Sequence, residues 1–117
     1  MEFTQIKEVI NQVYSDFNKR DIDKILAFMH PDVHWPNGWE GGYVEGHHGV
    51  RDYWTRQWKA LDPEVVPLRI DQLADGRIQV LVRQTVKDLE GKLLGAGEVR
   101  HVYTFGNGLI KTMEIES

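Results

Sequence analysis

The segment HWPNGWEGGYVEGHHGVRDYWTRQW (residues 34–58) is the most distinctive part of this chain. It contains all four tryptophans, two of the four tyrosines and three of the five histidines. Its middle, residues 36–42, is rich in proline, asparagine and glycine, which predicts a loop rather than a helix or a ladder strand. Large rings with one polar group suit the wall of a small-molecule pocket as well as they suit a protein core.

The bulk properties of the sequence predict one globular domain over residues 1–117. With 41% hydrophobic and 27% charged residues, the composition excludes a disordered or collagen-like chain. A net charge of −4 disfavours nucleic acid and anionic membranes as partners. The lack of cysteine excludes disulfides, thiolate metal ligands and a cysteine nucleophile. Without a basic leader or an apolar run of membrane-spanning length, the chain is expected to be cytoplasmic.

Three helices are expected in the first half of the chain. Apolar residues at helical spacing predict the first over residues 4–19, with Thr4 as its N-cap. A second, shorter helix would begin at Asp21, bury Met29 and end before Pro31. A brief strand follows at residues 33–35. Beyond the aromatic loop, the third helix is predicted at about residues 49–61, with one face formed by Val50, Tyr53, Trp54, Gln57, Trp58 and Leu61.

From residue 65 onward the apolar period changes to two, which indicates strands. Turn sequences at residues 75–76, 90–91 and 106–108 divide this half into four strands, the last ending at Glu116. The inward positions of the first strand are predicted to be Val66, Leu68 and Ile70, and those of the third to be Val99, His101, Tyr103 and Phe105. The predicted fold class is therefore α+β, three N-terminal helices packed on a curved antiparallel sheet of about four to six strands.

The order of these elements resembles the nuclear transport factor 2-like superfamily, which includes the ketosteroid isomerases and the SnoaL-like polyketide cyclases. The resemblance spans nearly the whole chain. It implies a cystatin-like cone that hosts isomerases, dehydratases, cyclases, hydrolases and non-catalytic binders, so the fold alone does not name the chemistry. The segments that carry it are VYSDFNKRD (residues 13–21), HPDVHW (30–35), EGHHGV (45–50) and HVYTF (101–105).

Two departures from the family's isomerases bear on the reaction. Those enzymes place a phenol on the first helix, a carboxylate base in the strand after the second helix and a protonated acid on a later strand. Tyr14 matches the phenol, whereas Trp35 stands at the position of the base and His101 at that of the acid. Because an indole cannot take a proton from carbon, the resemblance does not extend to steroid isomerase chemistry.

The candidate catalytic residues are His101, as acid or base, and Tyr14, as a donor to a developing oxyanion. Each has a structural alternative, since either ring could instead be a satisfied core residue. Gln84 is an amide on an apolar face, which a pocket explains better than a core. No cofactor and no metal are expected, because the rings of His47 and His48 should diverge. The candidate ligand-binding residues are Phe17, Trp35, Trp39, Tyr43, Trp54, Trp58, Gln84 and Tyr103.

The sequence predicts a protein that binds a small apolar or ring-containing carbonyl or hydroxyl compound in an internal cavity. It would act as a cofactor-free isomerase, dehydratase or cyclase through His101 and Tyr14. Two alternatives stay open, namely a non-catalytic binder of the same ligand and a homodimeric interaction module. Pairing of two copies is expected through the outer sheet face, formed by Arg100, Val102, Thr104, Ile110 and Thr112.

Overall fold

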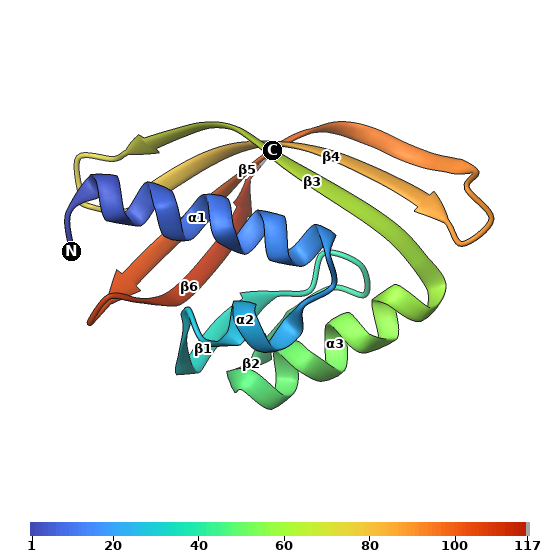
Figure 1. Ribbon diagram of the computed structural model, residues 1–117, viewed down its shortest axis with the longest axis horizontal. Coiled ribbons are helices and arrows are strands. Elements are labelled where there is room, and N and C mark those ends of the chain that lie inside the picture. Colours follow the sequence, from blue (N-terminus) through green and yellow to red (C-terminus); the bar gives the residue numbers. More distant parts are fainter. Residues whose placement is uncertain (117) are drawn as a thin grey trace.

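The computed structural model describes residues 1–116 and shows three helices against the concave face of one curved sheet (Figure 1). This arrangement confirms the predicted α+β class. The helices are α1 (Phe3–Asn18), α2 (Ile22–Leu26) and α3 (Gly46–Ala60). The strands are β1 (Met29–Pro36), β2 (Tyr43–Glu45), β3 (Leu61–Gln72), β4 (Ile78–Asp88), β5 (Leu93–Gly106) and β6 (Leu109–Glu116).

The six strands are ordered β2-β1-β6-β5-β4-β3, so β2 and β3 are free edges and the sheet does not close. All neighbours are antiparallel except β1 and β6, a parallel pair that the sequence did not predict. The register shifts where one residue has no opposite partner, at Leu68 of β3, Leu94 of β5 and Lys111 of β6. Such irregularities bend a strand and increase its twist, which gives the sheet its concave face.

The helices differ from the prediction mainly at their ends. The N-cap of α1 is Glu2, whose backbone N–H donates to the Gln5 side chain, so the expected cap Thr4 lies inside the helix. Asp21 caps α2 as predicted and accepts from the Lys24 N–H. The helix α2 nevertheless ends at Leu26, and Met29 is buried as the first residue of β1.

The short strand predicted at residues 33–35 is longer, and a second strand follows the aromatic loop. β1 begins at Met29 and includes Pro31, because the irregular register between β1 and β6 tolerates a residue without a backbone N–H. β2 has only three residues, too few for a periodic signal. α3 begins at Gly46, where φ is +72° and a Cβ would lie 3.2 Å from the Pro31 carbonyl oxygen, so only glycine fits this approach.

The inward face of β3 was predicted one residue out of step. Val65 is buried, whereas Val66 and Leu68 are each 39% exposed on the outer face. The bulge after Pro67 changes the alternation, so that Ile70 again packs against the core as expected. At the edge of the sheet, the Asn18 side chain donates to the Val65 carbonyl and accepts from the Val65 N–H, at 2.8 and 3.0 Å. The end of α1 thereby fixes β3 where no further strand pairs with it.

The outer sheet face also differs from the prediction at two positions. Ile110 is completely buried in the core rather than on the outer face. Val102, between the inward-facing His101 and Tyr103, is only 2% exposed, so its neighbours cover it. Pairing of two copies through this face stays a prediction.

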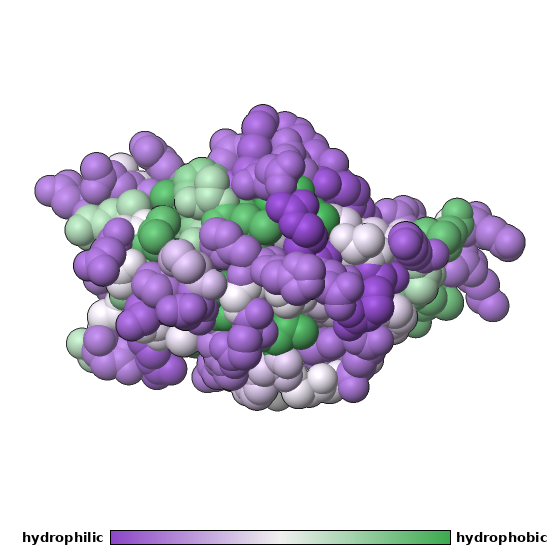
Figure 2. All heavy atoms as spheres, turned by 90° about the horizontal axis from the view of Figure 1, so that it is seen from below, coloured by the Kyte–Doolittle hydropathy of each residue, from purple (hydrophilic) through white to green (hydrophobic). Residues whose placement is uncertain are grey.

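The β4–β5 hairpin projects beyond the helices at the right of Figure 1. Figure 2, seen from below, shows hydrophobic residues in the middle and left of this face and a separate group of them at the projecting end. That group includes the exposed side chains of Leu89, Leu93 and Leu94. Among the described residues, no helix combines the length and the hydropathy needed to cross a membrane.

Replacing Asn18 with alanine should lower the free energy of unfolding by about 1–2 kcal/mol, because two hydrogen bonds to the edge strand are lost together. Urea unfolding monitored by circular dichroism measures the change. Lys19→Ala, one residue further along and exposed, is the control and should change stability by less than about 0.5 kcal/mol. Equal stability of Asn18→Ala and the wild type would show that water replaces the side chain without loss.

Candidate functional site

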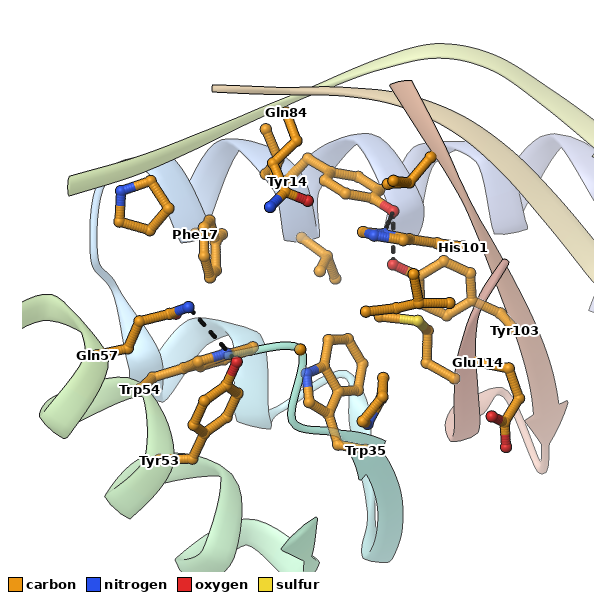
Figure 3. Close-up of a pocket in the computed structure, with 18 of the residues that line it drawn as sticks. Tyr14, Phe17, Trp35, Tyr53, Trp54, Gln57, Gln84, His101, Tyr103 and Glu114 are labelled. Carbon is orange, nitrogen blue, oxygen red and sulfur yellow. Dashed lines mark hydrogen bonds between the residues drawn. The ribbon is translucent and has the colours of Figure 1, made fainter. Parts of the chain in front are cut away.

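A cavity of about 470 Å³ lies between the concave sheet and the helices (Figure 3). Its walls come from α1, α3, β1 and strands β3 to β6, together with the aromatic loop. Both candidate catalytic residues, His101 and Tyr14, line it. So do six of the eight candidate ligand-binding residues, namely Phe17, Trp35, Tyr43, Trp54, Gln84 and Tyr103. Trp39 and Trp58 are not among the lining residues.

Three polar rings meet at one end of this cavity. The Tyr14 hydroxyl lies 2.7 Å from His101 Nδ1 and 2.7 Å from the Tyr103 hydroxyl. All three side chains are buried, and their exposed fractions are 4%, 7% and 1% respectively. α1 supplies the first ring, and alternate inward positions of β5 supply the other two. We call this set the Tyr–His–Tyr triad (Tyr14, His101 and Tyr103).

Burial keeps every member of the triad uncharged at neutral pH. It lowers the pKa of His101 from 6.5 to about 4. It also raises the pKa of Tyr14 well above its ordinary value, and the adjacent Tyr103 raises it further. The pKa of Tyr103 is raised by burial as well. The triad can therefore donate and accept hydrogen bonds, but it offers no fixed charge to a ligand.

An aromatic wall faces the triad across the cavity. Trp35 packs edge to face against Trp54 at 5.5 Å and tilts toward Tyr103 at 6.2 Å. Phe17 also meets Trp54 edge to face, at 5.4 Å. Trp58 stacks on Trp54 at 5.7 Å without lining the cavity, so it supports the wall from behind. Rings in such contacts are held in fixed orientations, which suits recognition of a flat ligand.

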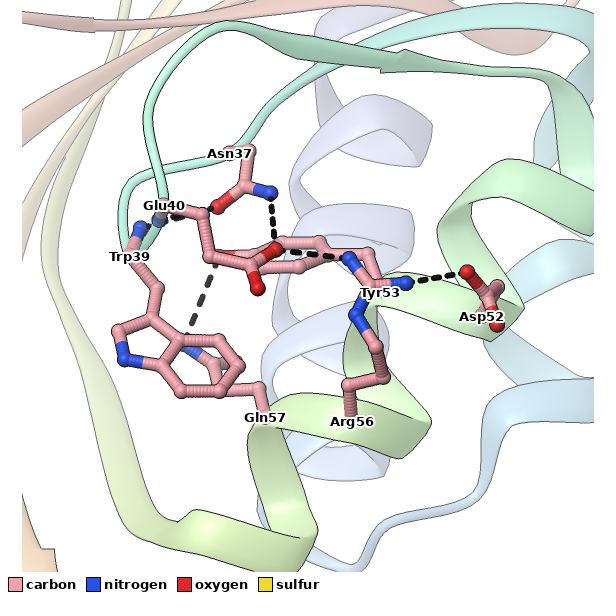
Figure 4. Close-up of polar contacts among 7 residues, drawn as sticks. All are labelled: Asn37, Trp39, Glu40, Asp52, Tyr53, Arg56 and Gln57. Atoms are coloured by element: carbon pink, nitrogen blue, oxygen red, sulfur yellow. Dashed lines mark hydrogen bonds and ion pairs between the residues drawn. The ribbon is translucent and has the colours of Figure 1, made fainter.

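A network of polar contacts holds the aromatic loop over the cavity (Figure 4). The Asn37 side-chain oxygen accepts from the backbone N–H groups of Trp39 and Glu40, at 3.1 and 2.7 Å. The Glu40 carboxylate in turn accepts from Asn37 Nδ2 and from Arg56 of α3, at 2.9 and 2.7 Å. Gly38 and Gly42 of this loop line the cavity, whereas Trp39 is 40% exposed. The network therefore positions loop backbone, not the Trp39 ring, at the cavity.

The cavity opens to solvent between the loop and the end of β6. Tyr43 and Ile115 line it there and are 51% and 41% exposed. The Tyr43 hydroxyl donates to Glu114 at 2.6 Å, and its ring stacks on His34 at 4.2 Å. Among the described residues, Glu114 is the one charged side chain that lines the cavity, and no lysine or arginine does.

The sequence profile of the SnoaL-like domain matches residues 10–113, which is most of the chain. This protein belongs to the SnoaL-like domain family, within the nuclear transport factor 2-like superfamily. The sequence matches none of the curated proteins with which it was compared.

Solved structures agree with this assignment. TerC, co-crystallised with polyporic acid, is 30% identical, with a TM-score of 0.81 over 95% of this chain and 89% of that chain. An NTF2-like protein from Burkholderia pseudomallei K96243 is 24% identical, with a TM-score of 0.83 over 99% and 91%. RV0760c from Mycobacterium tuberculosis, in complex with estradiol-17beta-hemisuccinate, is 16% identical, with a TM-score of 0.80 over 95% and 92%. The last two similarities show the fold alone.

The adjacent histidines of this SnoaL-like domain, His47 and His48, differ in their surroundings. His47 Nε2 donates to the Met29 carbonyl at 2.9 Å, which ties α3 to β1. His48 is exposed. Across residues 1–116, no three side chains of the metal-binding types lie close enough together to hold a metal ion.

Sequence reasoning missed several lining residues of the SnoaL-like cavity. Tyr53 and Gln57 were placed on the buried face of the third helix, but periodicity cannot separate a face against a core from a face against a cavity. Their side chains approach each other at 3.4 Å. Glu114 and Ile115 lie at the end of the last strand, where nothing in the sequence signals a rim.

The lowered pKa of His101 makes the stability of this SnoaL-like domain depend on pH. The unfolded imidazole, with a pKa near 6.5, binds a proton more readily than the folded one, so stability falls as the pH drops from 6.5 toward 4. The His101 contribution amounts to roughly 3 kcal/mol between pH 7 and pH 4. Urea unfolding at both pH values, in the wild type and in His101→Gln, isolates it because the variant lacks that part of the loss. An equal loss in both proteins would contradict a buried neutral imidazole.

Proposed function

We propose that this protein binds a small, uncharged, ring-containing carbonyl or hydroxyl compound in its cavity and transfers a proton on it without a cofactor. The observation that carries the proposal is the position of the triad. Three hydrogen-bonding rings, all uncharged, lie at one end of an otherwise mostly apolar and aromatic cavity. Apolar walls with a few placed polar groups are typical of small-molecule sites.

The size of the cavity supports a ligand of a few rings. Its volume of about 470 Å³ falls within the range of roughly 300–1,000 Å³ that is usual for such sites. Edge-to-face contacts hold Trp35 and Trp54 in place along one wall, opposite the triad. A flat ring system can therefore pack on the tryptophans while its oxygen reaches the triad.

The charge of the cavity supports an uncharged ligand. A buried anion needs a positive partner or several hydrogen-bond donors to offset its loss of hydration. Among residues 1–116, no lysine or arginine lines the cavity, and the Glu114 carboxylate stands at its rim. An anionic ligand would therefore lose hydration without a compensating charge.

The relatives support the class of ligand. TerC, 30% identical to this chain, was crystallised with the small molecule polyporic acid. Proton transfer is the part of the proposal that rests on His101 and Tyr14, with the imidazole as acid or base and the phenol as donor to the carbonyl oxygen. The indole of Trp35 at the position of the family's base favours the rival reading, a non-catalytic binder.

A charge-matched pair of probes tests the binding. We expect 2-acetonaphthone, which is neutral, to bind at least about tenfold more tightly than 2-naphthoate, which carries a carboxylate on the same rings. Quenching of tryptophan fluorescence reports the affinity, since Trp35 and Trp54 line the cavity. Tighter binding of the anion, or no binding of either compound, would overturn the proposal.

Filling the cavity should abolish this binding without unfolding the protein. Val99 lines the cavity from β5, and Val99→Trp places a second ring system in the space that the ligand needs. The expected loss of affinity for 2-acetonaphthone is at least about tenfold, measured by isothermal titration calorimetry. Val66→Trp, on the outer face of β3, is the matched control and should bind as the wild type does. Unchanged binding by Val99→Trp would place the ligand elsewhere.

A further inference from the structure

The hydrogen bonds of the Tyr–His–Tyr triad can be arranged in two ways in which Tyr103 donates to the Tyr14 oxygen. The Tyr14 oxygen can accept from both His101 Nδ1–H and Tyr103 O–H, which leaves its own hydrogen for a ligand oxygen. Alternatively, Tyr14 can donate to His101 Nδ1, which leaves Nε2–H facing the cavity. A third arrangement, in which Tyr14 donates to Tyr103, directs the Tyr103 hydrogen at the cavity and leaves Tyr14 without a proton for a ligand.

The two arrangements differ in what they present to a ligand. The first presents an acceptor, the lone pair of His101 Nε2, beside a donor, the Tyr14 hydroxyl. The second presents Nε2–H as a donor instead. Within residues 1–116 no hydrogen-bond partner occupies Nε2, and both rings line the cavity. The triad can therefore convert from one arrangement to the other only by exchanging protons with what the cavity holds.

We propose that the triad is a neutral proton relay that interconverts the keto and enol forms of the bound carbonyl compound. This inference rests on the proposed function and adds the reaction to it. The ligand binds with its carbonyl oxygen at the Tyr14 hydroxyl and the C–H of the adjacent carbon at His101 Nε2. Its conversion to the enol moves three protons together and leaves no charged group behind.

The atoms and charges of this step balance. The ligand C–H bond breaks as an N–H bond forms at Nε2 of His101. The Nδ1–H bond of the same ring breaks as its proton passes to the Tyr14 oxygen, 2.7 Å away. The original O–H bond of Tyr14 breaks as its proton joins the ligand oxygen. The C–H electron pair becomes the enol double bond, and the protein ends in the second arrangement. Where the enol is conjugated to a second double bond, return of the proton to the far carbon of that dienol completes an isomerisation.

The surroundings of the triad favour a relay over a lone base. Deprotonation of the ligand by His101 alone would create a buried imidazolium and an enolate, and burial disfavours both charges. The groups that face the imidazole from α1 and β5 are the two phenols, which cannot neutralise it, and the one carboxylate of the cavity is at the rim. A relay avoids both ions. It also removes the need for a carboxylate base, whose position Trp35 occupies.

Tyr103 is a positioning residue in this scheme. Its hydroxyl donates to the Tyr14 oxygen both before and after the transfer, so it fixes the orientation of that hydroxyl without exchanging a proton with the ligand. Its role is distinguished from packing because Tyr103→Phe keeps the ring and removes only the hydrogen bond.

The relay is tested with 2-tetralone, a neutral bicyclic ketone, in D₂O. Exchange of its C1 protons for deuterium is followed by proton NMR, with binding measured in parallel by tryptophan fluorescence. We expect His101→Gln and Tyr14→Phe each to slow protein-catalysed exchange by at least about a hundredfold, the usual contribution of acid–base catalysis, while 2-tetralone stays bound. Tyr103→Phe should slow it by about tenfold. The control His48→Gln, an exposed histidine, should exchange at the wild-type rate.

A second measurement separates the relay from a lone base. The second substrate is 2-tetralone deuterated at C1, and the rate at which it releases this deuterium is measured in mixtures of H₂O and D₂O. A plot of this rate against the deuterium fraction of the solvent should curve downward, because two exchangeable protons move together with the carbon-bound deuterium. A linear dependence, or full activity of Tyr14→Phe, would overturn the relay. Binding of 2-tetralone without exchange would also overturn it, but would leave ligand binding standing. Absence of 2-tetralone binding would instead overturn the proposed function.

Discussion

The hydrogen bond between the Tyr14 hydroxyl and His101 Nδ1 joins two residues that are 87 positions apart in the chain. To form this bond, α1 must cross the concave face of the sheet at the level of His101. The His101 side chain must also point from β5 toward the helix. Buried polar atoms cost free energy unless they are paired, so this contact favours one placement of the helix over others that would bury the same apolar area. The two rings are nearly parallel, with their centroids 5.9 Å apart, and both line the cavity.

The curvature of the sheet has the same local origin. Bulges in β3, β5 and β6 bend strands that would otherwise lie flatter against α1. A flat sheet packed on a helix leaves little space between them, whereas a bent one leaves a hollow that side chains only partly fill. In this protein the tryptophans narrow the hollow from the α3 and β1 side, and the loop held by Asn37, Glu40 and Arg56 covers it.

The titratable residues that hold the aromatic loop at the surface of this domain are charged, whereas those that line the interior of the cavity are neutral. At the surface, Arg56 lowers the pKa of Glu40 and both stay charged, which holds the aromatic loop by ion pairing. Inside, burial disfavours the charged forms of His101 and the two phenols, so all three act as neutral donors and acceptors. A site of this kind discriminates by hydrogen bonding and shape. Such discrimination suits rings with one or two oxygens better than it suits salts or phosphates.

Local patterns in the sequence were enough to predict the class of the fold and much of the wall of the cavity. Helical spacing, the change to a period of two after residue 65 and the turn sequences act over short distances, so they can be read without a structure. The same local rules predicted that His101 and Tyr103 lie on the inward face of β5, where they alternate with residues of the outer face. They failed for Val66 and Leu68, since the true alternation of β3 depends on its pairing with β4.

Which of these residues are in contact depends on how the helices and strands pack together. Trp54 and Trp58 belong to the same helix face, yet one lines the cavity and the other supports it, because Phe17 and Trp35 approach that face from other elements. The parallel pairing of β1 with β6 and the rim around Glu114 likewise arise from segments far apart in the chain. The periodicity of apolar residues predicts which side of a helix or strand is shielded from solvent. Whether side chains or a cavity cover it depends on distances between elements, which no local pattern contains.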